Sequence, residues 1–339
     1  MAVANAVADG RIKVACIGNS VTYGYGIEGR DSLAYPAQLQ RMLGDNYEVR
    51  NFGKSGATLL RHGHRPYNEQ KEYRKALEYG AEIVVVHLGL NDTDPRNWPN
   101  FRDEFEHDYR QLIDSLQAAA PEGHLKRLVT CLMTPIFSGH PRFESGTRDW
   151  HSEIQDAIRR VATHYGVDPL DIHSPLHCRP DLFPDNLHPT AEGAEILART
   201  VYGGITGDWG GLSLPEVYGN GMVLQHDAPA LTGRANAGTK VTVTVRGKHH
   251  KQRTSATADD NGYWRTALEP LKPGGPYTID IETSDKENLQ LQDVLAGEVW
   301  LCSGQSNMAF RLDQCATAQN DVLQAPAYEE VAKGACLRF

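Results

Sequence analysis

The sequence predicts an α/β protein whose first half is a doubly wound parallel sheet of about five strands, with a small β-sandwich after it. The first observation is that short, continuous apolar segments alternate with longer amphipathic segments between residues 11 and 203. Strands of this kind are buried on both faces, as in a parallel sheet covered by helices. The second observation is a change beyond residue 204, where glycine-rich sequence gives way to short segments of alternating apolar residues, which are typical of antiparallel sheets.

The elements of the first half follow one another as repeated strand–helix units. Strands are expected at 11–18, 47–53, 82–89, 125–135 and 167–172. Helices are expected at 32–43, 67–80, 101–120, 150–165 and 189–203. Because ligands of such sheets bind beyond the carboxyl ends of the strands, we expect functional side chains in the segments that follow each strand.

The second half begins with a glycine-rich segment, GGITGDWGGLSLP, which we expect to be a linker. Alternating apolar residues then predict strands at 240–247, 262–270 and 276–283, separated by turn residues. Residues 294–310 return to a continuous apolar strand followed by a glycine turn. The expected domains are therefore a catalytic domain at 1–205, a β-sandwich at 206–296 and a third segment at 297–339.

The charge balance limits the partners of the protein. The chain carries 34 Lys and Arg against 43 Asp and Glu, a formal net charge of −9, which disfavours nucleic acid or an anionic membrane surface. No apolar stretch approaches the roughly 20 residues that span a bilayer. The opening residues, MAVANAVADG, do not have the pattern of a signal peptide. We expect a secreted or periplasmic protein whose signal has been removed, with a cytoplasmic location as the alternative; the sequence predicts no oligomeric state.

Two interpretations compete for the segment IGNSVTYGYG after the first strand. Gly24, Gly26 and Gly29 fit the pattern G-x-G-x-x-G of a dinucleotide-binding turn. That turn needs its first glycine directly after the strand and an acidic residue at the end of the second strand. Here Gly24 lies six residues beyond Gly18, and the second strand ends in VRNFG. The pattern disfavours a nucleotide and leaves Ser20 as a candidate nucleophile.

A serine nucleophile needs a base, a carboxylate that orients the base, and donors for the oxyanion. Gly56 follows the second strand and Asn91 follows the third. Asp185 and His188 lie in the segment FPDNLHPT before the last helix, at a spacing that can leave one imidazole nitrogen for Ser20. Each element alone has a structural explanation, as a turn glycine, a capping asparagine or a helix lead-in. Their order at successive strand ends favours a catalytic site.

The residues resemble the conserved blocks of the SGNH, or GDSL-like, hydrolase family over residues 11–205. The matching blocks are GNS at 18–20, Gly56, GLND at 89–92 and DNLHP at 185–189. One departure is Asn19, which stands where the usual first block has an aspartate. Because that position is not one of the catalytic residues, the departure concerns the local turn geometry more than catalysis.

The resemblance implies a flavodoxin-like fold and hydrolysis of an ester in two steps. It assigns Ser20 as the nucleophile, His188 as the general base and Asp185 as the residue that orients the base. It also implies an oxyanion hole formed by the N–H groups of Ser20 and Gly56 and by the side chain of Asn91.

The second half closely resembles the opening of sialate O-acetylesterase-like proteins, over residues 212–339. The segments that carry this resemblance are GNGMVLQHDAPA and GEVWLCSGQSNMAF. That family has a β-sandwich ahead of an SGNH-type domain, and its nucleophile in the GQSNM motif corresponds to Ser306. No later Asp-x-x-His pair follows in this sequence. We therefore expect residues 297–339 to be the truncated start of a second esterase domain, with Ser306 a nucleophile only in the uncut protein.

No cofactor and no metal site are predicted. His62, His64 and His87 lack further ligands at a suitable spacing, and none of the six cysteines forms C-x-x-C. Cys16 and Cys131 lie inside apolar strand-like segments, where cysteine is usually a small buried hydrophobe.

The sequence predicts a serine carbohydrate esterase that removes O-acetyl groups from acetylated oligosaccharides or polysaccharides, with xylan or xylo-oligosaccharides preferred. Tyr23, Tyr25, Trp98 and Trp150 lie in or near expected loops, where they could stack on sugar rings or simply pack. The alternatives are a sialate O-acetylesterase, a lipase-like or thioesterase-like hydrolase of the same fold, and a glycan-binding module with a vestigial site.

Overall fold

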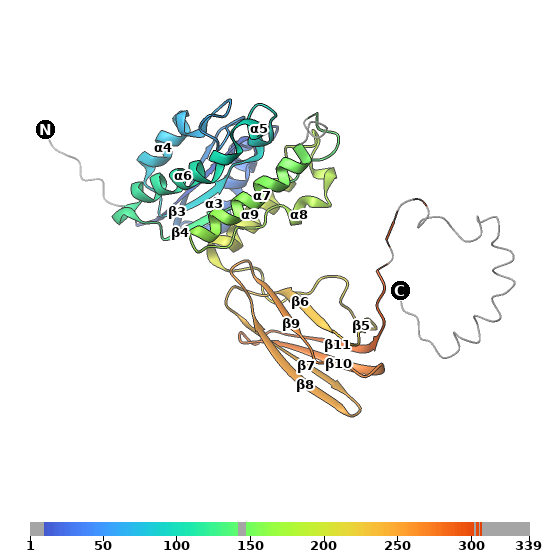
Figure 1. The fold of residues 1–339 in the computed structure, drawn as a ribbon. Helices are drawn as coiled ribbons and strands as arrows, with labels where there is room; N and C mark the ends of the chain where they lie inside the picture. The colour runs from blue at the N-terminus through green and yellow to red at the C-terminus, as the bar shows by residue number, and fades with distance from the viewer. Residues whose placement is uncertain (1–9, 142–146, 302, 305, 307–339) are drawn as a thin grey trace. The chain divides into compact units, whose positions relative to one another are not determined.

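The computed structural model describes residues 10–141, 147–301, 303, 304 and 306 (Figure 1). The chain divides into two compact units: the first runs to Trp209 and includes Asp260–Gly262, and the second comprises Gly210–Asp259 and the residues from Tyr263 onward. Each unit has its own hydrophobic core.

The first unit is built on a parallel sheet with the strand order β2-β1-β3-β4. This confirms the predicted α/β class with a doubly wound parallel sheet. The strands are β1 (Ile12–Gly18), β2 (Tyr47–Gly53), β3 (Ile83–His87) and β4 (Arg127–Thr130). Every residue of β3 is buried, as expected for a strand covered by helices on both faces.

The predicted fifth strand is reduced to one parallel bridge between Cys131 and Leu170. Leu170 donates its N–H to the carbonyl of Thr130 and accepts from the N–H of Leu132. The ladder does not extend further along the chain because the Ile172 N–H, the next one due to face β4, donates to the carbonyl of Leu170 instead. The carboxylate of Asp171 accepts the N–H groups of His173 and Ser174 and turns the chain.

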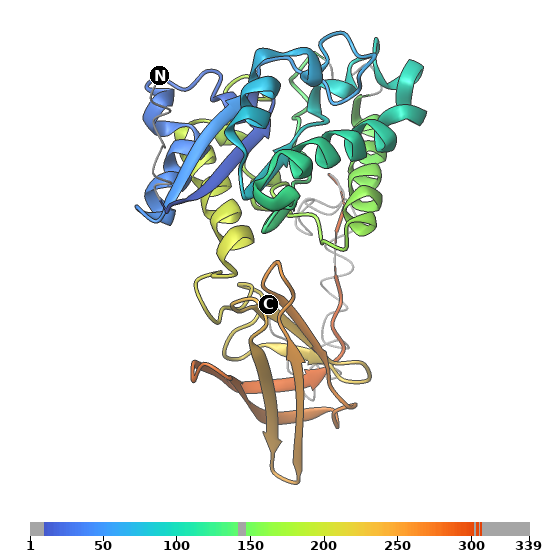
Figure 2. The same cartoon turned by 90° about the vertical axis from the view of Figure 1, so that its left-hand side faces the viewer.

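Helices cover both faces of the sheet. Helix α3 (Tyr35–Leu43) packs against α9 (Ala191–Thr206) and β2, while α6 (Phe105–Ala119) packs between α4 (Lys71–Tyr79) and α7 (Thr147–His164) (Figure 2). The shorter helices connect these elements. They are α1 (Ser20–Tyr23), α2 (Arg30–Leu33), α5 (Trp98–Phe101) and α8 (Ser174–His177), with 3₁₀ turns at Tyr67–Glu69, Leu90–Thr93, Arg102–Glu104, Pro121–Gly123 and Pro180–Leu182.

The strand register brings the ends of the three strands β1, β2 and β3 to one row. Gly18, the last residue of β1, pairs with Gly53 of β2 on one side and with His87 of β3 on the other. The segments that follow these strands therefore leave the same edge of the sheet. An ideal Cβ on Gly53 would lie 2.3 Å from the backbone nitrogen of Tyr23, so glycine is needed for α1 to lie across the end of β2.

The second unit is a small β-sandwich. A five-stranded sheet has the order β5-β11-β10-β7-β8, and β6 pairs with β9 in a two-stranded sheet. The strands are β5 (Val223–Gln225), β6 (Ala230–Arg234), β7 (Lys240–Gly247), β8 (His250–Thr257), β9 (Tyr263–Ala267), β10 (Gly274–Thr283) and β11 (Asn288–Gly297). Inward-facing residues such as Val243, Trp264 and Ile279 form its core.

The strand expected at the start of the third segment belongs partly to the sandwich. Val294 to Gly297 lie in β11, which pairs with β10 and β5. Beyond it, Val299, Trp300 and Leu301 are exposed. Ser306 is also exposed, and residues 307–339 of the predicted second esterase domain lie outside the described residues.

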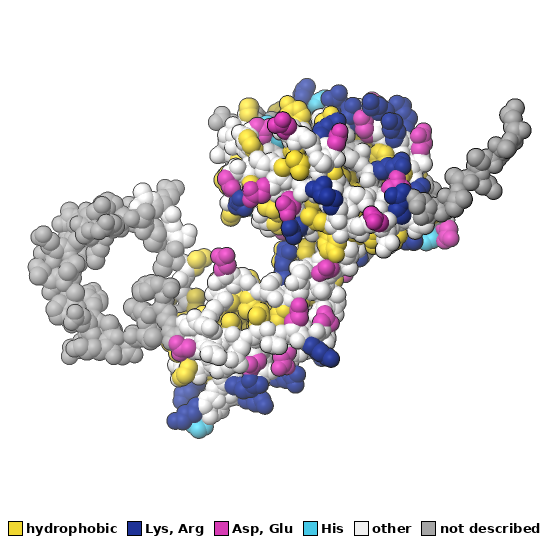
Figure 3. Space-filling model, turned by 180° about the vertical axis from the view of Figure 1, so that it is seen from behind, with side chains coloured by type: hydrophobic (Ala, Val, Ile, Leu, Met, Phe, Trp, Pro, Cys, Tyr) yellow, Lys and Arg dark blue, Asp and Glu magenta, His cyan; other side chains and the backbone are white. Residues whose placement is uncertain are grey.

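Charged side chains of both signs occur over the face shown in Figure 3. No helix in the described part of the chain is both long and apolar enough to cross a bilayer.

The close approach at Gly53 predicts a cost for adding a side chain there. The Cβ of a Gly53→Ala variant would overlap backbone atoms of Thr22 and Tyr23, which cannot move independently of the helix. We expect a loss of about 1–3 kcal/mol in the free energy of unfolding, measured by urea denaturation. Gly219→Ala is the matched control, because its Cβ would meet nothing within 4 Å. Equal stability of the two variants would contradict the packing argument.

Candidate active site

Ser20 is presented by the turn between β1 and α1. The side chain of Asn19 caps this short helix, because its Oδ1 accepts the N–H of Val21 at 2.9 Å. Asparagine thus serves the capping role here that an aspartate could also serve. The Ser20 residue is 5% exposed, and the turn directs its hydroxyl toward the segment that precedes α9, as the contacts below show.

Asp185 and His188 lie in a tight turn just before α9. The Asp185 Oδ1 accepts the backbone N–H groups of Leu187 at 3.1 Å and His188 at 2.7 Å, an arrangement that aspartate favours in turns. Thr190 then caps α9 by accepting the N–H of Gly193. The turn therefore fixes the carboxylate and the imidazole on the same side of the helix start.

The three side chains form a continuous chain of hydrogen bonds. The Nδ1 of His188 lies 2.6 Å from Asp185 Oδ2, and its Nε2 lies 2.8 Å from Ser20 Oγ. With the proton on Nδ1, which the carboxylate favours, the Nε2 lone pair accepts the serine hydroxyl. Partial burial raises the pKa of Asp185, but the hydrogen bonds from His188 and Leu187 outweigh it and leave the pKa below its usual value. The carboxylate therefore stays ionised beside the imidazole.

Two of the predicted oxyanion donors, Gly56 and Asn91, lie in the segments that follow β2 and β3. Neither the N–H of Ser20 nor that of Gly56 donates a hydrogen bond within the described part of the chain. The Lys54 N–H donates to the carbonyl of Gly18 at 2.8 Å, which holds the Gly56 loop against the end of β1. The Asn91 Nδ2 donates to the carbonyl of Ala57 at 2.9 Å, so Asn91 also adjoins the Gly56 loop.

Two buried polar side chains outside the predicted set of site residues connect these loops. The carboxylate of Asp92 accepts the N–H groups of Leu59 and Leu60 at 2.9 and 2.8 Å. Its burial raises its pKa to about 6, although these hydrogen bonds work in the opposite direction. Asn97 accepts the N–H of His64 at 2.9 Å and donates to the carbonyl of Asn91 at 2.8 Å. Asp92 was already visible within GLND, whereas nothing in the sequence distinguished Asn97.

The histidines considered as metal ligands do not converge. His62 lies on the surface, with its Nδ1 2.7 Å from Glu104 Oε2. His64 contacts Asn97, and His87 is buried at the end of β3. Within the part of the chain that the structure describes, no group of three or more histidine, cysteine or acidic residues could hold a metal ion.

The aromatic residues from the expected loops differ in their surroundings. Trp98 is buried and donates to Glu153, so it packs rather than meeting a ligand. The guanidinium of Arg30 lies over the ring of Tyr23, with its Cζ 3.9 Å from the ring centroid. Tyr25 contacts the triad, since its ring centroid lies 4.6 Å from that of the His188 ring.

A second set of histidines holds the chain after β4. His151 donates to the carbonyl of Thr134 at 3.0 Å, and the Nδ1 of His173 lies 3.1 Å from the carbonyl of Met133. The Nε2 of His87 accepts the Thr134 N–H at 3.4 Å. Burial, together with neighbouring histidine charge, lowers the pKa of both His87 and His151 to about 4. These side chains are therefore neutral in the folded protein at pH 7.

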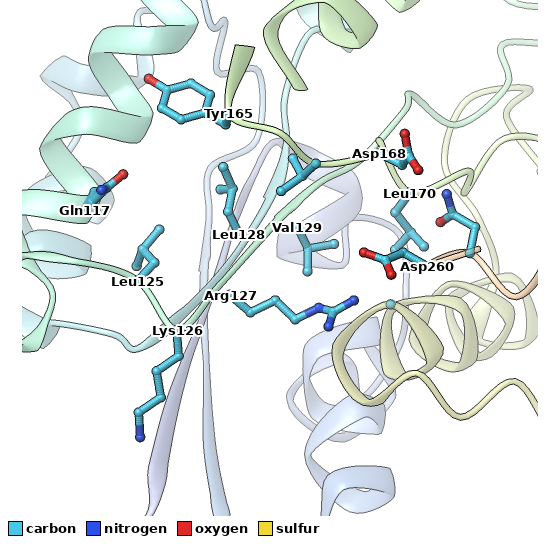
Figure 4. Close-up of a pocket in the computed structure, with 13 residues that line it drawn as sticks. Gln117, Leu125, Lys126, Arg127, Leu128, Val129, Tyr165, Asp168, Leu170 and Asp260 are labelled. Atoms are coloured by element: carbon cyan, nitrogen blue, oxygen red, sulfur yellow. The ribbon is translucent and has the colours of Figure 1, made fainter. Parts of the chain in front are cut away.

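A hollow in the first unit lies apart from the triad. Figure 4 shows its lining, which includes Leu128 and Val129 of β4 and Tyr165 beyond α7. None of the triad residues lines this hollow. Burial raises the pKa of Tyr165 above its usual value, so its hydroxyl stays protonated and offers no nucleophile there.

A serine, a histidine and an aspartate joined in this order at the carboxyl edge of a doubly wound parallel sheet are the arrangement of a serine hydrolase. The chain belongs to the GDSL-like lipase/acylhydrolase family, whose model matches residues 16–196. This confirms the resemblance found in the sequence, which rested on the residues around Ser20, Asn91 and His188.

The chain is also similar to particular acetylesterases. An acetylxylan esterase of Xylanibacter ruminicola is 36% identical over 207 residues, 56% of this chain and 42% of that protein. The sialate O-acetylesterase of Homo sapiens is 37% identical over 129 residues, 36% of this chain and 24% of that protein. The solved Axe2 acetylxylan esterase of Geobacillus stearothermophilus is 20% identical, with a TM-score of 0.42 over 58% of this chain and 95% of that chain. The chain spans less than half the length of either curated relative.

The neutral histidines predict a loss of stability in weak acid. In the unfolded chain histidine binds a proton near pH 6.5, whereas His87 and His151 bind one only near pH 4 when folded. Stability therefore falls as the pH drops from 6.5 toward 4, by about 2 kcal/mol for each histidine between pH 7 and pH 5. Urea denaturation at the two pH values measures the change.

His151→Gln provides the matched variant for this measurement. Glutamine can still donate to the carbonyl of Thr134 but has no proton to gain in this range. The variant is expected to lose less stability between pH 7 and pH 5 than the unchanged protein. An identical pH dependence in both proteins would remove His151 as a cause.

Proposed function

We propose that the protein is a serine carbohydrate esterase that removes O-acetyl groups from acetylated glycans. The observation that carries the proposal is the hydrogen-bonded chain from Ser20 Oγ through His188 to Asp185. The membership of the GDSL-like lipase/acylhydrolase family supports ester hydrolysis. The similarity to proteins named acetylxylan esterase and sialate O-acetylesterase supports an acetyl group on a sugar.

In the first step, Ser20 Oγ attacks the carbonyl carbon of the acetyl ester. His188 Nε2 accepts the hydroxyl proton, and the ionised Asp185 stabilises the imidazolium that forms. The negative charge that develops on the carbonyl oxygen is met by the N–H groups of Ser20 and Gly56 and by the amide of Asn91. The C–O bond to the sugar then breaks, and the imidazolium returns its proton to the sugar oxygen.

In the second step, water hydrolyses the acetyl-enzyme. His188 takes a proton from the water, the resulting hydroxide attacks the same carbonyl carbon, and the oxyanion donors act again. Collapse of the second intermediate releases acetate and returns the proton to Ser20. Nothing besides water is consumed, so the proposed reaction needs no cofactor.

The preferred substrate in the proposal is acetylated xylan or its oligosaccharides. The support is the name of the Xylanibacter relative, which matches over the larger part of this chain. A sialate O-acetylesterase activity is the second candidate, supported by the 129-residue match to the human protein of that name. Release of acetate from acetylated xylo-oligosaccharides, compared with release from O-acetylated sialic acid, separates the two.

The test of the proposed function is acetate release from a panel of acetylated oligosaccharides. Ser20→Ala is expected to abolish release, whereas Ser306→Ala is expected to retain it, because Ser306 lies outside the proposed triad. Preference for octanoyl over acetyl esters would indicate a lipase-like or thioesterase-like hydrolase instead. If the unsubstituted protein releases no acetate, and Ser20→Ala binds acetylated glycans as tightly as it does, a binding module with a vestigial site is favoured.

The proposed oxyanion role of Asn91 has its own test. Removing one preorganised donor typically costs on the order of 10² to 10³ in kcat, so Asn91→Ala is expected to lose this much on a small acetyl ester. Asn100→Ala is the control, since Asn100 is an exposed asparagine whose side chain donates only to a nearby backbone carbonyl. A kcat for Asn91→Ala within a few-fold of the control would remove Asn91 from the oxyanion hole.

A further inference from the structure

The glycine-rich turn after Ser20 places an exposed aromatic ring on the proposed general base. Tyr25 is 53% exposed, so its ring contributes little to the core. Its ring centroid nevertheless lies 4.6 Å from that of His188, with the two planes inclined at 45°. A large exposed aromatic residue in contact with a triad side chain calls for an explanation other than packing.

Backbone hydrogen bonds tie Tyr25 to the nucleophile itself. The carbonyl of Ser20 accepts the N–H groups of both Gly24 at 3.0 Å and Tyr25 at 2.9 Å. Gly24 and Gly26 flank Tyr25 with φ values of 85° and 80°, a region that residues with a Cβ rarely adopt. A Cβ on Gly24 would also lie 2.6 Å from that of Ala34. The glycines that fitted a nucleotide motif therefore shape the turn that presents Tyr25.

The hydrogen bonds to the two nitrogens of His188 restrain the imidazole less than a contact with the ring itself does, and Tyr25 provides that contact. Asp185 and Ser20 contact the two ring nitrogens, and both lie near the plane of the ring because hydrogen bonds to imidazole are directed along its edge. Such contacts restrain the ring weakly against tilting out of its plane. The carboxylate of Asp185 is the charged group that faces His188 from the same turn, and its side chain is 48% exposed, so solvent screens it.

We propose that Tyr25 is a positioning residue for His188, which holds the imidazole in its reacting orientation and stabilises the imidazolium form during proton transfer. The inclined contact restrains tilting of the ring, and the π-system of tyrosine attracts a cation near its face. The inference rests on the proposed function, since it assumes that His188 accepts the proton of Ser20. It adds a fourth side chain to the proposed triad.

The test compares Tyr25→Phe with Tyr25→Leu in the full chain. The probe is a fluorophosphonate, which labels a serine that an adjacent base activates and needs no sugar. At pH 7.5 Tyr25→Leu is expected to be labelled at Ser20 about two- to fivefold more slowly. The acidic limb of its pH–rate profile is expected to move about half a pH unit lower, because the imidazolium has lost its aromatic neighbour. Tyr25→Phe keeps the ring and is expected to restore both.

Tyr23→Leu is the control for the pH profile, because Tyr23 lies two residues before Tyr25, at the end of α1, and its ring packs against Arg30 instead. Its acidic limb is expected to stay in place. If Tyr25→Leu is labelled like the unsubstituted protein but has a higher KM for acetylated oligosaccharides, Tyr25 is a sugar-stacking residue and the positioning role is overturned. The role is also overturned if Tyr25→Leu is labelled more slowly but keeps the acidic limb of its pH–rate profile in place. A Tyr25→Phe variant that does not restore both the labelling rate and the acidic limb overturns it as well.

The labelling experiment separates this inference from the proposed function. Labelling of Ser20 without acetate release from any glycan would reject the carbohydrate substrate. The role of Tyr25 would then be decided by the labelling rates and pH profiles of Tyr25→Leu and Tyr25→Phe. An unlabelled Ser20 in the unsubstituted protein would overturn both, since no activated serine would then exist for His188 and Tyr25 to serve.

Discussion

Parallel pairing of β1 with both of its neighbours is the constraint on which the site depends. Because Gly18 pairs with Gly53 on one side and with His87 on the other, the loops after three strands leave the sheet at one level. The loop of Ser20, the loop of Gly56 and the 3₁₀ turn of Asn91 then become neighbours. A shift of one residue in either pairing would separate them and would turn the side chains of that strand to the opposite face.

The elements of the site that follow from strand ends were accessible from the sequence. Ser20 and Asn91 directly follow apolar strand segments, and His188 lies in the polar turn before the last helix. Acyl transfer needs a nucleophile, a base and a hydrogen-bond donor, so the residue types at these positions suggested their roles. Asn97 and the Tyr25–His188 contact were not accessible, because they depend on side chains from different loops meeting after folding. A buried asparagine that joins two loops has the same local sequence pattern as one that merely caps a turn.

The fold shows the same division between local and tertiary information. Apolar continuity located β1 to β4, and the alternation of β7 and β10 located the sandwich. The fifth strand was overestimated because its apolar residues suggested a longer ladder. Beyond Leu170 the Ile172 N–H bonds back to the Leu170 carbonyl and the Asp171 carboxylate turns the chain, so a single bridge remains. The strand β11 begins at Asn288, earlier than the apolar segment expected from Val294. The exposed Asn288 and Gln290 interrupt the apolar pattern but still pair with β10.

The hydrogen bond between Ser20 and His188 joins residues 168 positions apart, and this has a consequence for biosynthesis. A nascent chain exposes the hydroxyl early, but the imidazole emerges from the ribosome only when nearly the whole of the first unit has been made. The serine is therefore chemically ordinary throughout translation of β1 to β4. The hydrogen bond therefore forms only when the segment before α9 docks against the end of β1, so the proposed triad is completed late in the synthesis of the first unit.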